Sequence, residues 1–462
     1  MWHIDPATPS QRRGRGSWGD AGDPTHHPKP DPSVAEGFGV DEGILKRLIP
    51  IVCWIVLAAP AAGQEAYIPT VELIERDNEW FVLRDGETTK LHGAGVSSQQ
   101  AHLLDFLASK GGVVTRTWGT KNIGAYLDRA HKNGVGVIVG FWMGHERHGF
   151  NYANAEQVAE QLANAQKAIQ QYKDHPAVLM WSVGNEVEAN AKDVDLVYHA
   201  MSDIVAVVKD EDDRRPVITV VAEISKEKVR KLNRIVPWLD GLGINSYGGI
   251  KTLGRRVTEY GWKKPFIVTE YGPRGAWDAK KTAWRAPLEP TSSQKAAQYG
   301  NGFDAVASHP QCIGTIAFIW GWKSEATPTW FGMFLEDGSR LGAVDVLQKR
   351  WTEKGPRRRA PVIKSLVWLG DSGNVRPGST VTLVAETVAE SSDRLKFAWS
   401  LMPEKSFRKS DVESSVEAIE GTGSTVSFIA PDAPGAYRLA VIAKSRRRTA
   451  ATANIPFRVV ED

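Results

Sequence analysis

Residues 180–186 read MWSVGNE and residues 266–272 read FIVTEYG, and the rest of the chain is arranged around these two stretches. Each is a short apolar run typical of a buried strand, and each ends in a carboxylate, Glu186 or Glu270, where the hydrophobic pattern stops. A single such glutamate is most simply the first solvated residue after a strand. Two of them, on repeats of strand and helix, instead predict a pair of carboxylates at one end of a barrel.

The composition is that of an ordinary globular protein with two or three domains. Of 462 residues, 42% are hydrophobic and 24% are charged, and the net charge of +3 gives no support for a nucleic-acid partner. The 17 tryptophans are the unusual count, because an aromatic face near a strand end can stack on a sugar or fill the core. Those near predicted strand ends are Trp118, Trp142, Trp181, Trp320 and Trp322.

The two cysteines exclude a disulfide framework. Cys53 lies in a segment that we expect to be removed, and Cys312 is predicted to be a buried thiol.

The amino-terminal end is predicted to be no part of the fold. Residues 1–43 are rich in Pro, Gly, Asp, His and Arg without hydrophobic period, which predicts a disordered or mis-assigned leader. Residues 44–63 combine Lys46 and Arg47 with an apolar run and small residues, the pattern of a signal peptide cleaved between Ala61 and Gln64. The run is shorter than the roughly 20 residues of a membrane span, so we expect a secreted or periplasmic protein, with an uncleaved anchor as the alternative.

Residues 64–355 are predicted to form a (β/α)8 TIM barrel, because apolar strands and amphipathic helices alternate eight times. A strand-rich lead-in with a hairpin turn at Asp85-Gly86 comes first. The competing doubly wound sheet lacks a GxGxxG fingerprint at its first turn. The predicted strands are 90–95, 113–118, 135–142, 178–185, 216–221, 241–247, 266–271 and 313–320, and the helices are 123–132, 155–172, 194–209, 226–235, 293–308 and 341–351.

Chemistry in such barrels sits at the carboxyl ends of the strands. The polar and aromatic residues at those ends are His92, Arg116, Trp118, Trp142, His145, Glu146, Asn185, Glu186, Asn245, Tyr247, Glu270 and Trp320.

In kind and order, these residues resemble the retaining glycoside hydrolases of clan A. The resemblance consists of an Arg after the second strand, Asn-Glu after the fourth, a Tyr after the sixth, a Glu after the seventh and a Trp after the eighth, and it covers roughly residues 67–355. Family 2 barrels are the most similar, because both HGAG at residues 92–95 and WSVGNE at 181–186 look like theirs. The jelly-roll domain that usually precedes a family 2 barrel has no room here.

Glycosidic hydrolysis needs one carboxylic acid that protonates the leaving oxygen and a second carboxylate. Glu186 fits the role of the acid/base, and Asn185 could donate a hydrogen bond to a sugar hydroxyl. Glu270 fits the role of the nucleophile, which Tyr247 and Arg116 could hold in its ionised form. Arg116 could also be a structural ion pair at the rim. We expect carboxyl groups about 5 to 5.5 Å apart for a retaining enzyme, whereas about 9 Å would indicate an inverting one. An apolar wall that raises the pKa of Glu186 is expected from Trp142, Trp181, Val183 and Trp320.

The segment after the third strand is predicted to be a sugar-binding wall. His145 to His148 read HExH, one residue short of the HExxH spacing of a zinc site, so we expect no metal and no cofactor. His145 and Glu146 would hydrogen-bond a sugar that stacks on Trp142, and Trp118, Asn245 and Trp320 complete the expected substrate-binding set.

Two long aromatic loops, residues 272–291 and 321–338, are predicted to cover the cleft and to provide several subsites. Such subsites favour an oligosaccharide or polysaccharide substrate, with a β-glucan among the candidates. The alternative is that the tryptophans of these loops pack the loops on one another.

Residues 360–462 are predicted to form a β-sandwich of immunoglobulin or fibronectin type, with Trp399 in its core. Both carbohydrate binding and bracing of the barrel stay open for this module. Its predicted strands are 362–369, 380–386, 395–401, 425–429, 437–443 and 451–459.

The sequence therefore predicts a secreted retaining glycoside hydrolase or transglycosylase without a membrane span after processing. A catalytically silent barrel that binds glycan, with the sandwich as an adaptor, is the alternative, and the intact Glu186 and Glu270 argue against it. A barrel aldolase or lyase would need a lysine at a strand end, and Lys323 lies just beyond the last one.

Overall fold

The computed structural model describes residues 68–461 except 371–372, 390–393 and 405–416. The predicted leader at 1–43, the signal peptide at 44–63 and Cys53 lie outside the described residues.

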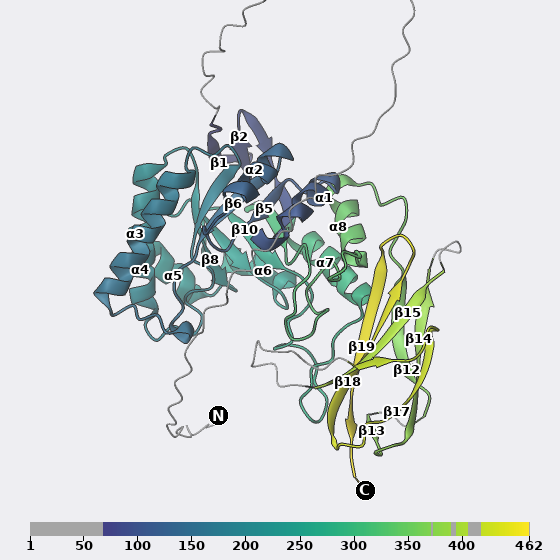
Figure 1. Ribbon diagram of the computed structural model, residues 1–462. Helices are drawn as coiled ribbons and strands as arrows, with labels where there is room; N and C mark the ends of the chain where they lie inside the picture. Colours follow the sequence, from purple (N-terminus) through teal and green to yellow (C-terminus); the bar gives the residue numbers. More distant parts are fainter. Residues whose placement is uncertain (1–67, 371–372, 390–393, 405–416, 462) are drawn as a thin grey trace, which may run out of the picture. The chain divides into compact units, whose positions relative to one another are not determined.

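Eight parallel strands close into a barrel, which confirms the predicted fold (Figure 1). They follow one another around the ring in sequence order, and all eight predicted strands are present. They are β4 (Leu91–Ala94), β5 (Val114–Arg116), β6 (Gly136–Phe141), β7 (Val178–Val183), β8 (Val217–Ala222), β9 (Gly241–Asn245), β10 (Phe266–Tyr271) and β11 (Cys312–Ala317). Cys312 is a buried free thiol, as predicted, and burial raises its pKa to about 11.

Helices cover the outside of the barrel (Figure 1). The short helices α1 (Leu104–Ser109) and α6 (Leu253–Glu259) were not predicted, because fewer than two turns give little periodicity. Three longer helices begin at side-chain caps, Asn154, Asp193 and Thr291, the last in a capping box. The helices are α1 (Leu104–Ser109), α2 (Gly124–Lys132), α3 (Ala155–Tyr172), α4 (Val194–Glu211), α5 (Lys226–Ile235), α6 (Leu253–Glu259), α7 (Ser292–Val306) and α8 (Gly342–Thr352), with 3-10 turns η1 (Ser98–Leu103), η2 (Glu146–His148) and η3 (Ile250–Thr252).

The lead-in forms an antiparallel sheet of β1 (Val71–Arg76), β2 (Glu79–Arg84) and β3 (Glu87–Thr89). Asp85 and Gly86 have φ of +54° and +86°, as the predicted hairpin turn requires. Val71 and Val82 share a buried cluster with Ile138, Met180 and other barrel residues, so the sheet packs on the barrel interior.

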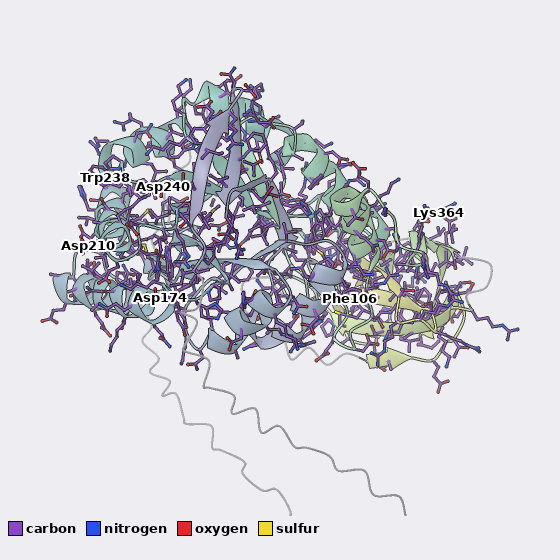
Figure 2. All side chains as sticks on the ribbon, turned by 90° about the horizontal axis from the view of Figure 1, so that it is seen from above. Phe106, Asp174, Asp210, Trp238, Asp240 and Lys364 are labelled. Carbon is purple, nitrogen blue, oxygen red and sulfur yellow. The ribbon has the colours of Figure 1, made fainter. Side chains whose placement is uncertain are left out.

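Side chains on barrel strands divide between two cores. Met180 belongs to the interior cluster, whereas Trp181 belongs to the larger cluster between strands and helices and stacks on Phe141 at 5.2 Å. Figure 2 draws the side chains of the described residues and labels Phe106, which lies on α1. Described helices include none that is long and apolar enough to cross a membrane.

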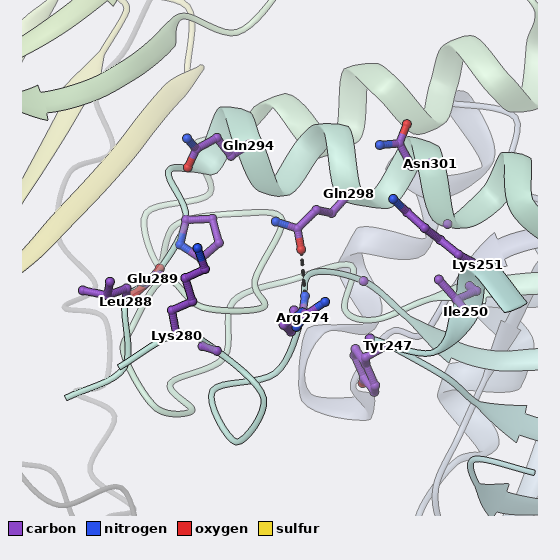
Figure 3. A pocket seen from close by; sticks show the side chains of 15 residues that line it. Tyr247, Ile250, Lys251, Arg274, Lys280, Leu288, Glu289, Gln294, Gln298 and Asn301 are labelled. Carbon is purple, nitrogen blue, oxygen red and sulfur yellow. Dashed lines mark hydrogen bonds between the residues drawn. The ribbon is translucent and has the colours of Figure 1, made fainter. Parts of the chain in front are cut away.

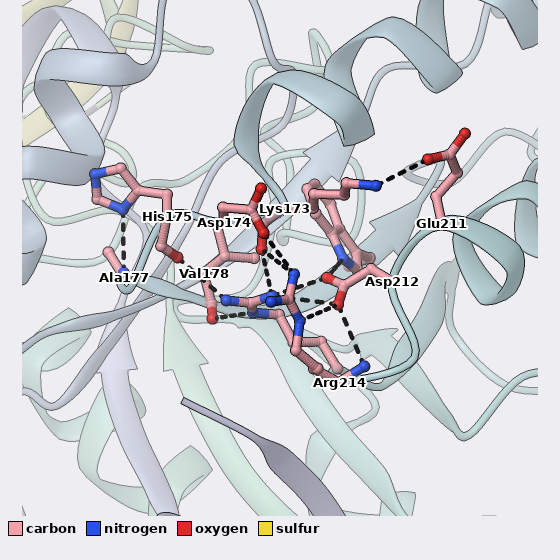
Figure 4. A network of polar contacts seen from close by, with 10 residues as sticks. Lys173, Asp174, His175, Ala177, Val178, Glu211, Asp212 and Arg214 are labelled. Carbon is pink, nitrogen blue, oxygen red and sulfur yellow. Dashed lines mark hydrogen bonds and ion pairs between the residues drawn. The ribbon is translucent and has the colours of Figure 1, made fainter. Parts of the chain in front are cut away.

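A buried polar network holds the strand that leads to Glu186 (Figure 4). Nε1 of Trp181 donates to Oδ2 of Asp212 at 2.8 Å, and Arg215 pairs with the same oxygen at 2.9 Å. Nε of Arg215 also donates to the carbonyl of Val178 at 2.8 Å. Because both ions are buried and their hydrogen bonds are made, the network fixes β7 relative to the end of α4.

Two further sheets form the predicted sandwich. Trp399 is buried between them, as expected, and its Nε1 donates to the carbonyl of Gly423. One sheet has the order β12-β14-β17 and the other β13-β19-β18-β15-β16. The strands are β12 (Val362–Trp368), β13 (Asn374–Val375), β14 (Thr380–Val388), β15 (Lys396–Pro403), β16 (Glu417–Ile419), β17 (Thr425–Ile429), β18 (Gly435–Lys444) and β19 (Ala450–Val459).

The sandwich holds the loop that precedes α7. Arg438 on β18 donates to the carbonyl of Pro287 at 2.9 Å, and Asn454 on β19 donates to Glu289 at 2.6 Å. The backbone N–H of Thr452 donates to Oγ of Ser292 at 2.9 Å. The module therefore braces the barrel at this loop.

Candidate active site

Glu186 follows β7 in a tight turn. Gly184 has a φ of +75°, and a Cβ there would lie 2.7 Å from Cγ2 of Val187, so only glycine fits. Glu186 itself has a φ of +52°, and its N–H donates to the carbonyl of Val220 at 2.9 Å. A non-glycine residue in the left-handed region costs conformational energy, and here the surrounding backbone fixes it at a candidate functional position.

Glu270 lies near the carboxyl end of β10 and is only 7% exposed. The pairing of β10 with β9 shifts register between Val268 and Glu270. Such an irregularity re-aims side chains, and here the side chains of both Thr269 and Glu270 bond to residues of the site.

Three donors hold the carboxylate of Glu270. Nε1 of Trp118 donates to Oε1 at 2.8 Å, and the hydroxyl of Tyr247 donates to Oε2 at 2.8 Å. Nη1 of Arg116 lies 3.4 Å from Oε1. Glu270 is thus hydrogen-bonded on both oxygens, an environment that favours its charged form.

Arg116, at the end of β5, is the central cation of the site and is only 1% exposed. Besides Glu270, its guanidinium donates to Oδ1 of Asn245 at 3.4 Å and to Oδ1 of Asn185 at 3.0 Å. Burial lowers its pKa and the charges of Glu270 and Glu186 oppose that shift, but an arginine keeps its proton in either case. Arg116 therefore lies inside the mouth of the barrel and contacts the nucleophile candidate.

Asn245, at the end of β9, connects the two glutamates. Its Nδ2 donates to Oε1 of Glu186 at 2.8 Å and to Oδ1 of Asn185 at 3.2 Å. Asn185 thus accepts with its oxygen from both Asn245 and Arg116. Across the part of the chain that the structure describes, the Nδ2 of Asn185 has no acceptor, so this amide can donate to a ligand.

The two carboxyl groups differ in their surroundings. Burial raises the pKa of Glu186, and the single hydrogen bond from Asn245 lowers it only in part. Burial also raises the pKa of Glu270, while Arg116, Trp118 and Tyr247 all act in the opposite direction. The net pKa of both glutamates is raised, but the three donors around Glu270 favour its charged form more than the single amide does for Glu186.

Aromatic side chains outside the predicted substrate-binding set line this side of the site, two of them on the long loops that were predicted to cover the cleft. Phe318, just after β11, lies 5.9 Å from Trp118 and 6.2 Å from Tyr247, measured between ring centroids. Phe331 and Trp277, from the two long loops, lie 5.6 and 5.7 Å from Tyr247. The long loops therefore pack on one another through rings, and the same rings fix Tyr247.

The prediction that Trp320 binds substrate is wrong. Trp320 is fully buried and packs between Phe106 of α1, Phe334 and Trp351 of α8, on the helix side of the barrel. No face of the ring is available to a sugar, and Phe318 lies at the mouth in its place.

The predicted apolar wall around Glu186 also needs correction. Trp181, Val183 and Trp320 all belong to the cluster between strands and helices. Trp142 does lie at the surface, with 53% of its area exposed. Burial is still the largest cause of the raised pKa of Glu186.

Trp142 and His145 border a cavity of about 970 Å³ after β6. Their rings lie 5.1 Å apart, and His145 is buried. The amide side chains of Gln157, Gln161 and Asn164 line the same cavity. Exposed aromatic and amide groups of this kind suit a sugar.

Glu146 stands apart from those groups. Its Oε2 accepts from the backbone N–H of Lys192 at 2.7 Å, so this carboxylate ties the segment after β6 to that after β7. His92, another strand-end candidate, stacks on Trp351 of α8 at 6.0 Å, on the helix side of β4.

Residues 125–277 match the model of a family described as "Glycosyl hydrolases family 2, TIM barrel domain". No curated protein matches the sequence. Among solved structures, a β-D-glucuronidase from Dictyoglomus thermophilum matches with a TM-score of 0.50 and 17% identity, over 62% of this chain and 54% of that one. A β-glucuronidase from an uncultured Clostridium sp. matches with a TM-score of 0.50 and 19% identity, over 62% of this chain and 54% of that one. A β-glucuronidase from Ruminococcus gnavus, in complex with C6-substituted uronic isofagomine, matches with a TM-score of 0.50 and 18% identity, over 62% of this chain and 53% of that one. The chain thus spans about half the length of these structures, which share its fold.

Proposed function

Because the barrel of this chain is most like that of the family 2 glycoside hydrolases, in clan A, we propose that the protein is a retaining β-glycosidase. Its substrate would be a β-linked oligosaccharide or polysaccharide. The reaction would be a double displacement with Glu270 as nucleophile and Glu186 as acid/base.

One observation carries the proposal: the unequal hydrogen bonding of two carboxyl groups that share Arg116 and Asn245 as neighbours. Glu270 accepts from three side-chain donors, including the cation Arg116. Glu186 accepts from the amide of Asn245 alone among described side chains. A nucleophile must be ionised while the acid keeps its proton, and this arrangement separates the two roles.

The chemistry follows from these positions. An oxygen of Glu270 attacks the anomeric carbon and Glu186 gives its proton to the departing oxygen, which forms a glycosyl ester on Glu270. Glu186 then takes a proton from water, or from a sugar hydroxyl in transglycosylation, as that oxygen attacks the anomeric carbon and releases Glu270. The amide nitrogen of Asn185 would donate to the 2-hydroxyl of the sugar, where contacts strengthen in the transition state.

The substrate-binding set becomes Arg116, Trp118, Asn185, Asn245 and Tyr247 around the scissile sugar. Trp142 and His145 would belong to the more distant wall, whereas Glu146, which accepts from the backbone N–H of Lys192, would not. The exposed Trp142 and its cavity favour a chain of several sugars over a small glycoside.

Labelling with a 2-deoxy-2-fluoro glycoside carrying an activated leaving group tests the proposal. The expected result is one covalent adduct on the peptide that contains Glu270, found by mass spectrometry, and no adduct in Glu270→Ala. NMR of the first product should show retained β-configuration. A label on another residue, or an inverted product, would contradict the assignment, and a protein that binds glycan without turnover or labelling would be the silent barrel.

The proposal includes export from the cytoplasm, which rests on the signal-like residues 44–63. Expression of the full chain should yield a mature amino terminus between Ala61 and Gln64. An uncleaved chain retained at the membrane would contradict it.

A further inference from the structure

A second cavity, of about 560 Å³, lies beside the candidate active site and is lined by basic and amide side chains (Figure 3). Its walls come from the segments that follow β9 and β10 and from α7. Tyr247, which donates to Glu270, also lines this cavity. We call it the basic cavity, after Lys251, Arg274 and Lys280; its amides are Gln294, Gln298 and Asn301.

Lys251, Arg274 and Lys280 have no carboxylate partner among the residues that the structure describes. The one carboxylate in the lining, Glu289, is buried and paired with Lys295 at 2.6 Å. Asp278 is the other acid nearby. It lies beside Gly248, a residue of the lining, because a Cβ added to Gly248 would lie 3.1 Å from Oδ2 of Asp278. Nε of Arg274 lies 3.9 Å from the same point, so Asp278 offsets part of the charge, and the three cations leave the basic cavity with a positive excess.

The wall of the basic cavity is fixed before a ligand arrives. The backbone N–H of Arg274 donates to Oε1 of Gln298 at 2.8 Å, and its carbonyl accepts from Nε1 of Trp330 at 3.0 Å. Because Oε1 of Gln298 is occupied, the amide nitrogen of that residue is left to donate. The far end of the same loop is held by Glu289, which bonds to Lys295 and to Asn454 of the sandwich.

The basic cavity lies across the barrel from the cavity at Trp142. Trp142 follows β6, and Arg274 follows β10, four positions away in either direction around the eight-stranded ring. Glu186 follows β7 and Glu270 lies near the end of β10, so a glycan that stacks on Trp142 and crosses both glutamates would reach the basic cavity at its other end.

We propose that the basic cavity is a subsite for an oxyanion carried by the glycan, a uronate carboxylate or a sulfate ester, on a unit adjacent to the sugar that is cleaved. Guanidinium, ammonium and amide N–H groups are the donors that such oxygens take. The inference rests on the proposed function and refines it, since it makes the preferred substrate an acidic β-linked glycan.

Calorimetric binding to Glu186→Gln tests this subsite with three matched oligosaccharides: one neutral, one with a uronate unit and one with an O-sulfated unit. The readout is the ratio of the neutral to the acidic Kd, which cancels any general loss of folded protein. We expect at least one acidic oligosaccharide to bind about tenfold more tightly than the neutral one, as a few partly exposed ion pairs provide. Adding Lys251→Gln, Arg274→Gln and Lys280→Gln should bring the ratio close to one.

A matched control removes three exposed cations elsewhere, with Lys167→Gln, Lys226→Gln and Arg230→Gln, and should keep the ratio. Preference for the sulfated or for the uronate ligand identifies the anion and supports the subsite in either case. Equal binding of all three ligands, or a ratio that survives loss of the three cavity cations, overturns it. The covalent label on Glu270 is read separately, so a failure of the catalytic proposal and a failure of this subsite are distinguishable.

Discussion

Asn245 and Glu186 are joined by a hydrogen bond of 2.8 Å from Nδ2 to Oε1, and the opposite end of the same amide fixes its direction. Oδ1 of Asn245 accepts from Arg116 and from the hydroxyl of Thr269. Since the guanidinium of Arg116 can only donate, the oxygen of the amide has to face it, and the amide presents its N–H to Glu186. The acid/base candidate is thereby linked to the cation that holds the nucleophile candidate.

Asn245→Ala should shift the alkaline limb of the kcat/KM profile to higher pH. The amide donates to the carboxylate and so lowers the pKa of Glu186, against the larger effect of burial; without it, that pKa rises further. Glu186 then stays protonated to higher pH. A profile measured with an activated and an unactivated substrate would show this, and an alkaline limb that moves down or stays fixed would contradict the assignment.

Tyr247→Phe should instead shift the acid limb upward. Burial raises the pKa of Glu270 and the tyrosine hydroxyl opposes this, so its removal makes Glu270 protonate at higher pH and lose nucleophilicity there. Phenylalanine keeps the ring contacts with Trp277, Phe318 and Phe331. The two variants therefore move opposite limbs, and an unchanged acid limb in Tyr247→Phe would show that another group controls it.

Glu186→Gln should impair substrates with poor leaving groups far more than activated aryl glycosides. The amide cannot protonate the leaving oxygen, which an activated aryl group does not require, and azide should restore turnover with the activated substrate. Steady-state kinetics on both classes measure the difference. Equal impairment of both classes, without rescue by azide, would show that the proton comes from another group.

Glu289→Gln should lower stability by about 3 kcal/mol, because it leaves Lys295 buried and unpaired. Glu289 also accepts from Thr327 and Thr329 of the second long loop, at 2.5 and 2.8 Å. Burial raises the pKa of Glu289, but Lys295 and the other partners outweigh it and the net pKa is lowered. The contribution of Glu289 to stability is therefore complete above the pKa that this residue has in the unfolded chain. It is lost as the pH falls through the lower pKa that Glu289 has in the folded protein.

Urea unfolding at neutral and acidic pH measures this effect. Glu325→Gln is the control, because Glu325 is a partly exposed carboxylate on the same loop whose pair with Lys323 is worth at most about 1 kcal/mol. Glu289→Gln combined with Lys295→Met should recover part of the loss. If Glu289→Gln is no less stable than the control, the buried pair does not hold the loop.

The sequence by itself determined the barrel and the pair of glutamates. Eight apolar runs alternate with amphipathic stretches, and such a pattern buries its apolar surface when parallel strands are covered by helices. Because parallel strands all point the same way, Asn185, Glu186, Asn245 and Glu270 had to meet at one edge once the strands were recognised. Arg116 followed from the same rule.

Only the tertiary structure decided which aromatic side chains face the site. In a barrel strand, neighbouring side chains point alternately to the interior and to the helices, and irregular pairing changes that order locally. Trp320 and Trp181 therefore face the helix layer although each lies near a predicted strand end, while Phe318 lies at the mouth. The basic cavity, likewise, unites Lys251, Arg274 and Lys280 from two loops whose approach depends on α7 and on the contact of Glu289 with Asn454. Local sequence sets which residues are apolar or charged, but the direction of a side chain depends on strand register and on contacts with residues far along the chain, and these exist only in the folded molecule.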